Sequence, residues 1–250
     1  MKIGIYCTVR SGELRLALAT LGYASLSDHI FNIAILVTDT DIAPEKPRKL
    51  SSKITLYNHN FGSGYSISVA DGGYDQIAAR NFLLERLADT DVDWLMMHDA
   101  DDIYLHDYYS FLSDKCMTAD AVTCSCFSLR PGPEICIPQE KKQYIQGKNL
   151  YDPHTRIWKK NLNLRYEKSA GIEKYFANHS RHCGVIFPED MNIVSTDGVY
   201  HFHLHALLNK RHSEKISAYS HQHILLPERI DHFLKKNNVL FHNDRQVLYA

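Results

Sequence analysis

The chain has 250 residues, with 28 basic and 29 acidic side chains and a formal net charge of −1. This length suits one α/β domain, which can bury a substantial core without disulfides or structural metals. The balanced charge excludes an overall field that would gather nucleic acid or an anionic membrane surface, so a polyanionic partner must be held locally.

The sequence lacks the features of export and membrane insertion. The apolar run from Ile3 to Cys7 is too short for a signal peptide, and no later stretch approaches the ~20 apolar residues of a membrane span. The six cysteines have no paired C-x-x-C spacing, and several lie in apolar runs, which favours reduced and buried thiols. We therefore expect a soluble, cytoplasmic protein.

Strands and helices alternate in the first half of the chain. Short apolar runs predict strands at residues 3–7, 31–38, 54–57 and 94–97. One helix is expected to begin near Ser11, and Asp75 is expected to cap another that continues to about Ala88. This alternation predicts a largely parallel sheet that helices cover on both faces.

The second half has a less regular pattern. Strands are predicted at residues 121–129, 156–158 and 198–204. The polar stretch from Gln139 to Asn149 is typical of a mobile loop. The tail from Pro227 to Ala250 is predicted to be helical.

Polar residues follow three of the predicted strands, at Thr8 to Arg10, Asp39 to Asp41 and Asp99 to Asp102. In an open parallel sheet the carboxyl ends of the strands meet at one edge, where ligands bind. Carboxylates spaced two residues apart can hold a hard divalent cation, and such a cation neutralises the diphosphate of a leaving nucleotide. These segments are the first candidates for a functional site.

The sequence contains four Asp-x-Asp pairs, so context must select among them. Asp89/Asp91 and Asp91/Asp93 precede a strand in a polar loop, where a solvated turn explains them better than a metal does. The pair Asp99/Asp101 directly follows a strongly apolar strand in mid-chain. Its alternative is a helix N-cap cluster in which Asp101 or Asp102 caps the segment that follows.

The histidine-rich run from Val199 to His205 is predicted to be a strand. Because side chains alternate along a strand, His201, His203 and His205 lie on one face and apolar residues on the other. Three imidazoles in register could bind a metal together with the Asp-x-Asp pair. A polar face at a sheet edge is the alternative.

The segment Ala79-Arg80-Asn81, followed some dozen residues later by the run from Asp93 to Asp102, resembles the nucleotide-sugar domain of the large GT-A glycosyltransferase family, whose best-known members are inverting. The resemblance covers roughly residues 1–205. It implies a GT-A fold, that is, a mixed, mainly parallel α/β sheet flanked by helices. Residues 1–105 would bind the nucleotide sugar, residues 106–205 the acceptor, and residues 206–250 would form a C-terminal helical segment or lid.

The resemblance also implies roles for individual residues. The donor, expected to be a UDP-sugar, would be bound by Thr8, Arg10, Asp39, Arg80, Asp99 and Ala100. Within this set Asp39 would bind the base, Asp99 the ribose or the surroundings of the metal, and Arg80 would lie near the diphosphate. Mn²⁺ or Mg²⁺ would be bound by Asp99 and Asp101, with His201 or His203 completing the site.

An inverting transfer needs a general base that takes the proton of the acceptor hydroxyl. Glu173 matches the family position for this base, although Ile172 stands where a histidine is usual. Asp190 is the second candidate. Glu173 could instead be a surface residue of a helix that includes Tyr175 and Phe176.

Two other functions compete with sugar transfer. A metallohydrolase could use His201 and His203 with Asp99 or Asp197 to activate water. A non-catalytic module could bind a nucleotide sugar without any base. The acceptor of a transferase is not specified: it could be a glycan or, if the basic segment beginning at Lys210 contacts a polyanion, a modified nucleobase in DNA.

Overall fold

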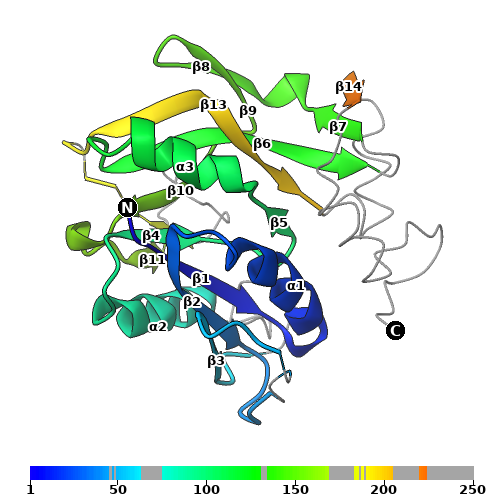
Figure 1. Ribbon diagram of the computed structural model, residues 1–250, viewed down its shortest axis with the longest axis vertical. Coiled ribbons are helices and arrows are strands. Elements are labelled where there is room, and N and C mark those ends of the chain that lie inside the picture. The colour runs from blue at the N-terminus through cyan, green and yellow to red at the C-terminus, as the bar shows by residue number, and fades with distance from the viewer. Residues whose placement is uncertain are drawn as a thin grey trace.

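The computed structural model describes residues 1–44, 47, 49–62, 75–130, 134–168, 183–185, 187–188, 190–204 and 220–223. Its centre is a large sheet with the strand order β14-β7-β6-β10-β4-β1-β2-β3, to which β13 and β5 are joined (Figure 1). This is the mixed, mainly parallel α/β sheet flanked by helices that the sequence predicts.

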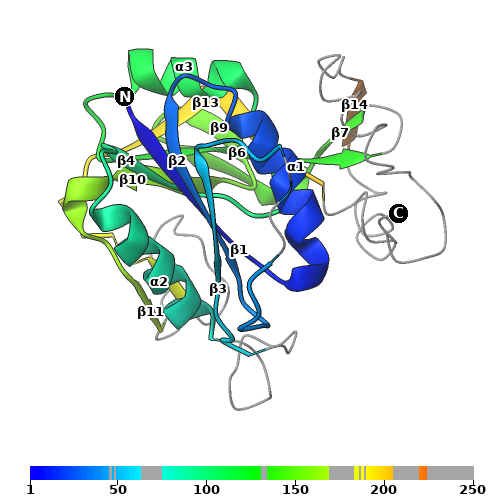
Figure 2. The ribbon, with the colours of Figure 1, turned by 60° about the horizontal axis from the view of Figure 1, so that its bottom comes forward.

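The first half of the chain forms the parallel part of the sheet, in which β1 pairs with β2 and β4, and β2 pairs with β3. Alternate residues of β1 enter two different cores: Ile5 lies in the core that α1 covers, and Tyr6 in the core that α2 covers. Figure 2 shows these helices on opposite sides of the strands. The elements are β1 (Ile3–Val9), α1 (Leu14–Ala24), β2 (Ile30–Val37), β3 (Ile54–Asn58), α2 (Gln76–Ala88) and β4 (Trp94–Met97).

The second half continues the sheet with mostly antiparallel pairs. Strand β10 pairs with β4 and β6, and β7 then connects β6 to β14. Strand β13 runs parallel to β6, and its end pairs with the short β5. The elements are β5 (Asp102–Ile103), α3 (His106–Lys115), β6 (Ala121–Arg130), β7 (Glu134–Ile137), β10 (His154–Lys159), β13 (Ile193–His203) and β14 (Ser220–His223).

Smaller elements complete the described chain. Two short strand pairs lie outside the main sheet, β8 with β9 and β11 with β12. The remaining elements are η1 (Ser11–Glu13), η3 (Gln139–Lys141), β8 (Lys142–Ile145), β9 (Lys148–Tyr151), η4 (Lys160–Leu162), β11 (Tyr166–Lys168) and β12 (Cys183–Val185).

The stretch from Gln139 to Asn149, predicted to be a mobile loop, is instead largely a β-hairpin. Gln146 and Gly147 have φ of 49° and 78°, so the turn that joins β8 to β9 has positive φ at two successive residues, as tight hairpin turns require. The Gln146 side chain donates to the Ile193 carbonyl at 2.6 Å and accepts from the Ser195 amide at 2.7 Å. These bonds dock the hairpin on β13.

The later helices, the C-terminal segment and the cysteines agree only in part with the predictions from the sequence. The helix α3 begins at His106 with Leu105 at its N-cap, so neither Asp101 nor Asp102 caps it as the alternative interpretation expected. Strand β14 shows that the segment after residue 205 contributes a strand and not only helix. The predicted helix from Pro227 to Ala250 lies outside the described residues. Five thiols are buried and free of disulfides, as expected: Cys7, Cys116, Cys124, Cys126 and Cys136. Among the described helices, none has the length and apolar character needed to span a membrane.

The N-terminus of α2 provides a test of the fold. Asp75 accepts a hydrogen bond from the Ala78 amide at 2.9 Å, which satisfies one of the unpaired donors of the first turn. We expect Asp75→Ala to lower the free energy of unfolding by about 1 kcal/mol, measured by urea denaturation. Asp75→Ser, which keeps a capping oxygen, should lose less than half as much; equal losses in the two variants would contradict the capping role.

Candidate functional site

The acidic segment that follows β4 is brought beside the end of β13. Phe202 pairs with Ile103 and His203 with Asp102 in the antiparallel β13–β5 ladder, and the Leu204 amide donates to the Asp101 carbonyl at 2.7 Å. Residues one hundred positions apart therefore meet at the carboxyl end of β4.

Arg156 holds two of the three carboxylates. Its Nη1 lies 2.8 Å from Asp99 Oδ2, and its Nη2 lies 3.9 Å from Asp102 Oδ2. Arg156 reaches them because β10 is paired with β4, with Ile157 opposite Met96. Burial acts to raise the pKa of both carboxyls, but Arg156 and the other nearby basic groups, His203 among them, together outweigh it, so the pKa of Asp99 is lowered and that of Asp102 is held well below its usual range.

His203 bridges Asp101 and Asp102, the second of which Arg156 also contacts. Its Nδ1 lies 2.8 Å from Asp102 Oδ1, and its Nε2 lies 3.4 Å from Asp101 Oδ2. Burial opposes charge on this imidazole, yet Asp101 and Asp102 raise the pKa of His203 to about 9. Burial also raises the pKa of Asp101 to about 6; His203 opposes this shift, and the nearby carboxylates add to it. The cluster therefore favours a positive charge at this position.

The donor set fits a divalent cation. Asp101, Asp102 and His203 each offer a ligand atom within 4.8 Å of the others. Because His203 Nδ1 is hydrogen-bonded to Asp102, its Nε2 is the nitrogen that faces Asp101 and can bind a metal. A carboxylate on the far nitrogen of a ligating histidine is the common way in which proteins orient that ring. Carboxylate and imidazole donors suit Mn²⁺, and Mg²⁺ with more oxygen ligands.

The proposed donor-side residues lie at the ends of neighbouring elements. Asp39, after β2, accepts from the Ser11 amide and hydroxyl, both at 2.9 Å, while the Arg10 amide donates to Glu13 at 3.2 Å. Thr8 is half-buried near the end of β1, where it pairs with Leu36.

Two further donor-side residues are held from the helices. The Ala100 carbonyl accepts from the hydroxyl of Thr20 on α1 at 2.9 Å. Arg80, buried on α2, has its guanidinium carbon 5.0 Å from the Tyr166 ring centroid, and its charge contributes to the lowered pKa of Asp99. Arg80 is therefore placed toward the acidic segment.

His201 belongs to a different group of side chains. It is fully buried, stacks on Tyr104 with ring centroids 4.7 Å apart, and forms a candidate ligand group with Cys126 and His154. Burial lowers the pKa of His201 to about 3, so it is neutral. The two histidines that the sequence offered as alternatives thus enter separate clusters, and the His-x-His pair does not form one site with Asp99.

Of the two candidate general bases, the described residues include Asp190 but not Glu173. Glu173 lies outside the described residues, as does His205. Asp190 is exposed in a turn closed by the Met191 amide, which donates to the Pro188 carbonyl at 3.2 Å. Sequence reasoning missed the roles of Arg156 and Asp102, although a charged residue within an otherwise apolar predicted strand was a usable signal for Arg156.

Comparisons with known proteins find likenesses at low sequence identity. No family model matches the sequence, and no curated protein matches it significantly. Among solved structures, 4-diphosphocytidyl-2C-methyl-D-erythritol synthase from Anaerococcus prevotii DSM 20548 has 12% identity and a TM-score of 0.39, over 64% of this chain and 71% of that one. TarS 1–349 from S. aureus has 10% identity and a TM-score of 0.45, over 83% of this chain and 61% of that one.

A TarS 1–349 structure in complex with UDP-GlcNAc gives similar values, with 10% identity and a TM-score of 0.45, over 82% of this chain and 58% of that one. The chain therefore spans less than two thirds of the length of these TarS structures. Likenesses of this degree do not assign an activity to the chain.

The buried ion pairs of Arg156 can be tested by stability. Arg156→Met would leave Asp99 and Asp102 without their cation, so we expect a loss of about 3–5 kcal/mol in the free energy of unfolding at pH 7. Because both carboxyls have lowered pKa values in the folded protein, the ion pairs stabilise it above the ordinary Asp pKa of about 3.9 and lose this effect as the pH falls through the lower folded values.

The difference in the free energy of unfolding between wild type and Arg156→Met should therefore become smaller from pH 7 to pH 3. Denaturant titration in the presence of EDTA measures it. Arg156→Lys, which keeps a charge but not the planar fork, should lie between the two. If this difference in the free energy of unfolding is below about 1 kcal/mol and does not depend on pH, the ion pairs of Arg156 stabilise the protein no more than exposed ion pairs do, which would contradict the prediction.

Proposed function

We propose that the chain is a cytoplasmic, metal-dependent glycosyltransferase of GT-A type that moves a sugar, a hexose, from a UDP-sugar to an acceptor hydroxyl. The observation that carries this proposal is the convergence of Asp101, Asp102 and His203 at the carboxyl end of β4. That edge is where open α/β sheets bind nucleotides. Buried, reduced thiols agree with a reducing compartment.

In this proposal Asp101 and His203 Nε2 bind Mn²⁺ or Mg²⁺, and Asp102 orients His203 from its other ring nitrogen. When bound, the cation would neutralise charge on the donor diphosphate as UDP leaves. The ion pair between Arg156 and Asp99 would keep the segment from Asp99 to Asp102 in its present conformation beside the metal. His203 must give up its proton to the solvent before it can bind the metal.

The neighbouring elements would bind the rest of the donor. Asp39, anchored by Ser11, would accept a hydrogen bond from N3–H of the uracil base, and Thr8 and Arg10 lie at the same end of β1. Arg80 would lie near the diphosphate. Asp99 and Ala100, held by Arg156 and Thr20, would define the wall of the donor site next to the metal.

The second half of the chain would bind the acceptor. Glu173 would take the proton of the acceptor hydroxyl as its oxygen attacks the anomeric carbon, with Asp190 as the second candidate base. In the proposed division, residues 1–105 bind the donor, residues 106–205 bind the acceptor, and residues 206–250 close over it. The acceptor is a glycan or a modified nucleobase in DNA.

The donor site is tested by calorimetric titration of UDP in the presence of Mn²⁺ and then of EDTA. We expect EDTA, Asp101→Asn and His203→Gln each to weaken UDP binding by about 100-fold or more, the upper end of the effect seen even for outer-shell partners. Asp91→Asn is the matched control, because Asp91 belongs to an Asp-x-Asp pair but is exposed and paired with Lys2. UDP binding that is indifferent to both EDTA and Asp101→Asn would contradict the proposal.

The base is tested by kinetics. Glu173→Gln should lower the rate of UDP release from a UDP-hexose in the presence of acceptor by about 10²–10⁴-fold, the usual contribution of a general base, while UDP affinity stays unchanged. Asp190→Asn should leave the rate within a few-fold of wild type. The reverse pattern would transfer the role to Asp190, and near-normal rates in both variants would rule out both assignments.

A further inference from the structure

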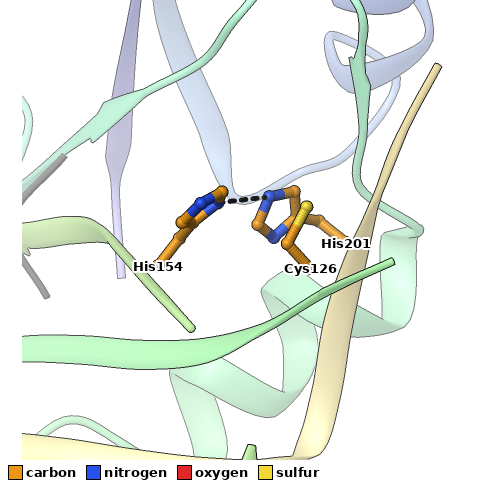
Figure 3. Close-up of side chains that lie close together, drawn as sticks. All are labelled: Cys126, His154 and His201. Carbon is orange, nitrogen blue, oxygen red and sulfur yellow. Dashed lines mark hydrogen bonds between the residues drawn. The ribbon is translucent and has the colours of Figure 1, made fainter. Parts of the chain in front are cut away.

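A second set of metal-ligating side chains lies on the central strands of the second half of the sheet. Cys124 and Cys126 point to the same face of β6, because side chains alternate along a strand. His154 of β10 is paired with Cys124 on one side of β6, and His201 of β13 is paired with Cys126 on the other. Three adjacent strands thus bring the side chains of Cys126, His154 and His201 close together (Figure 3).

The spacing of the two imidazoles matches tetrahedral coordination, and the thiol lies close to them. His154 Nδ1 and His201 Nε2 are 3.4 Å apart, and Cys126 Sγ lies within 4.8 Å of a ring nitrogen of each histidine. A tetrahedral Zn²⁺ with Zn–N of 2.0–2.1 Å and Zn–S of about 2.3 Å places its ligand atoms roughly 3.3–3.6 Å apart. The two nitrogens already have this separation, and a small rotation of the Cys126 side chain would bring its sulfur to the same distance.

The surroundings also support a bound cation. Asp152 Oδ1 lies 4.0 Å from His154 Nε2, which is the nitrogen that faces away from His201. Cys124 Sγ lies 3.8 Å from His201 Nδ1, again the outward nitrogen. The Cys124 sulfur and the Asp152 carboxylate thus lie beyond the far sides of the two imidazoles, where orienting groups of ligating histidines are found, although the Asp152 oxygen at 4.0 Å is not hydrogen-bonded to His154. Cys126 and His201 are buried, while the His154 side chain is 27% exposed, which gives an entry path.

We propose that Cys126, His154 and His201 form a zinc site that is separate from the Asp101 and His203 cluster and that binds β6, β10 and β13 together. A thiolate with two imidazoles selects a borderline-soft ion such as Zn²⁺, whereas Mn²⁺ and Mg²⁺ prefer oxygen ligands. Three protein ligands leave a fourth position for water on the exposed side of His154. Cys126 loses its thiol proton to the solvent when the ion binds.

The test uses the full chain, stripped with chelator and titrated with Co²⁺, whose absorption spectrum reports both tetrahedral geometry and a thiolate ligand, and with Zn²⁺ against a chromophoric competitor. We expect one equivalent of Co²⁺ to give a sulfur-to-cobalt charge-transfer band that Zn²⁺ abolishes. Cys126→Ser should remove this band, and Cys126→Ser and His154→Gln should each weaken Zn²⁺ binding by more than about 100-fold.

Two controls separate this site from its neighbours. Cys124→Ser removes a nearby thiol that faces the outward nitrogen of His201, and Asp101→Asn removes the proposed donor-site ligand. Both variants should keep the charge-transfer band, because neither removes the thiolate ligand. Asp101→Asn should also keep the Zn²⁺ affinity within a few-fold of wild type, whereas Cys124→Ser, which changes the group beside His201 Nδ1, should lower that affinity by about 10-fold or less. Absence of the band in the folded wild type, or its loss in Cys124→Ser but not in Cys126→Ser, would overturn the assignment.

Discussion

A buried guanidinium between two carboxylates fixes the centre of this molecule. Arg156 comes from β10, and Asp99 and Asp102 come from the segment that leaves β4, the parallel strand with which β10 pairs antiparallel. Burying these charges costs free energy that is offset only while both signs are present. The ion pairs therefore hold the acidic segment in one conformation, in which Asp101 faces His203.

Strand β13 connects this cluster to the rest of the second half. Phe202 faces an apolar core with Leu16 and Leu129, so His201 and His203 must face the opposite side. His203 meets carboxylates because the end of β13 pairs with β5, while His201 meets a thiol and an imidazole because it is paired with β6. Strand β13 thus contributes one histidine to a cluster with carboxylates and another to a cluster with a thiol. Clusters with these different ligand atoms select different metals.

The sequence predicted the elements whose signals are local. Apolar runs marked the parallel strands, and the Asp75 cap marked α2. The start of α3 could not be placed because Leu105 at its N-cap offers no capping side chain, while Asp101 and Asp102 just before it do. The β8–β9 hairpin was missed because Gln146 docks it through distant bonds to β13. No periodicity could show which histidine meets Asp102, since the β6–β13 register shifts between Thr196 and Tyr200.

Anomalous diffraction at the manganese edge, from crystals grown with Mn²⁺ and UDP, would show directly whether Asp101 and His203 bind the metal. We expect one strong manganese peak bound by the Asp101 carboxylate and His203 Nε2, with the UDP diphosphate on the same ion and the base near Asp39. A manganese peak elsewhere, or UDP bound away from the end of β4, would contradict the assignment of this site.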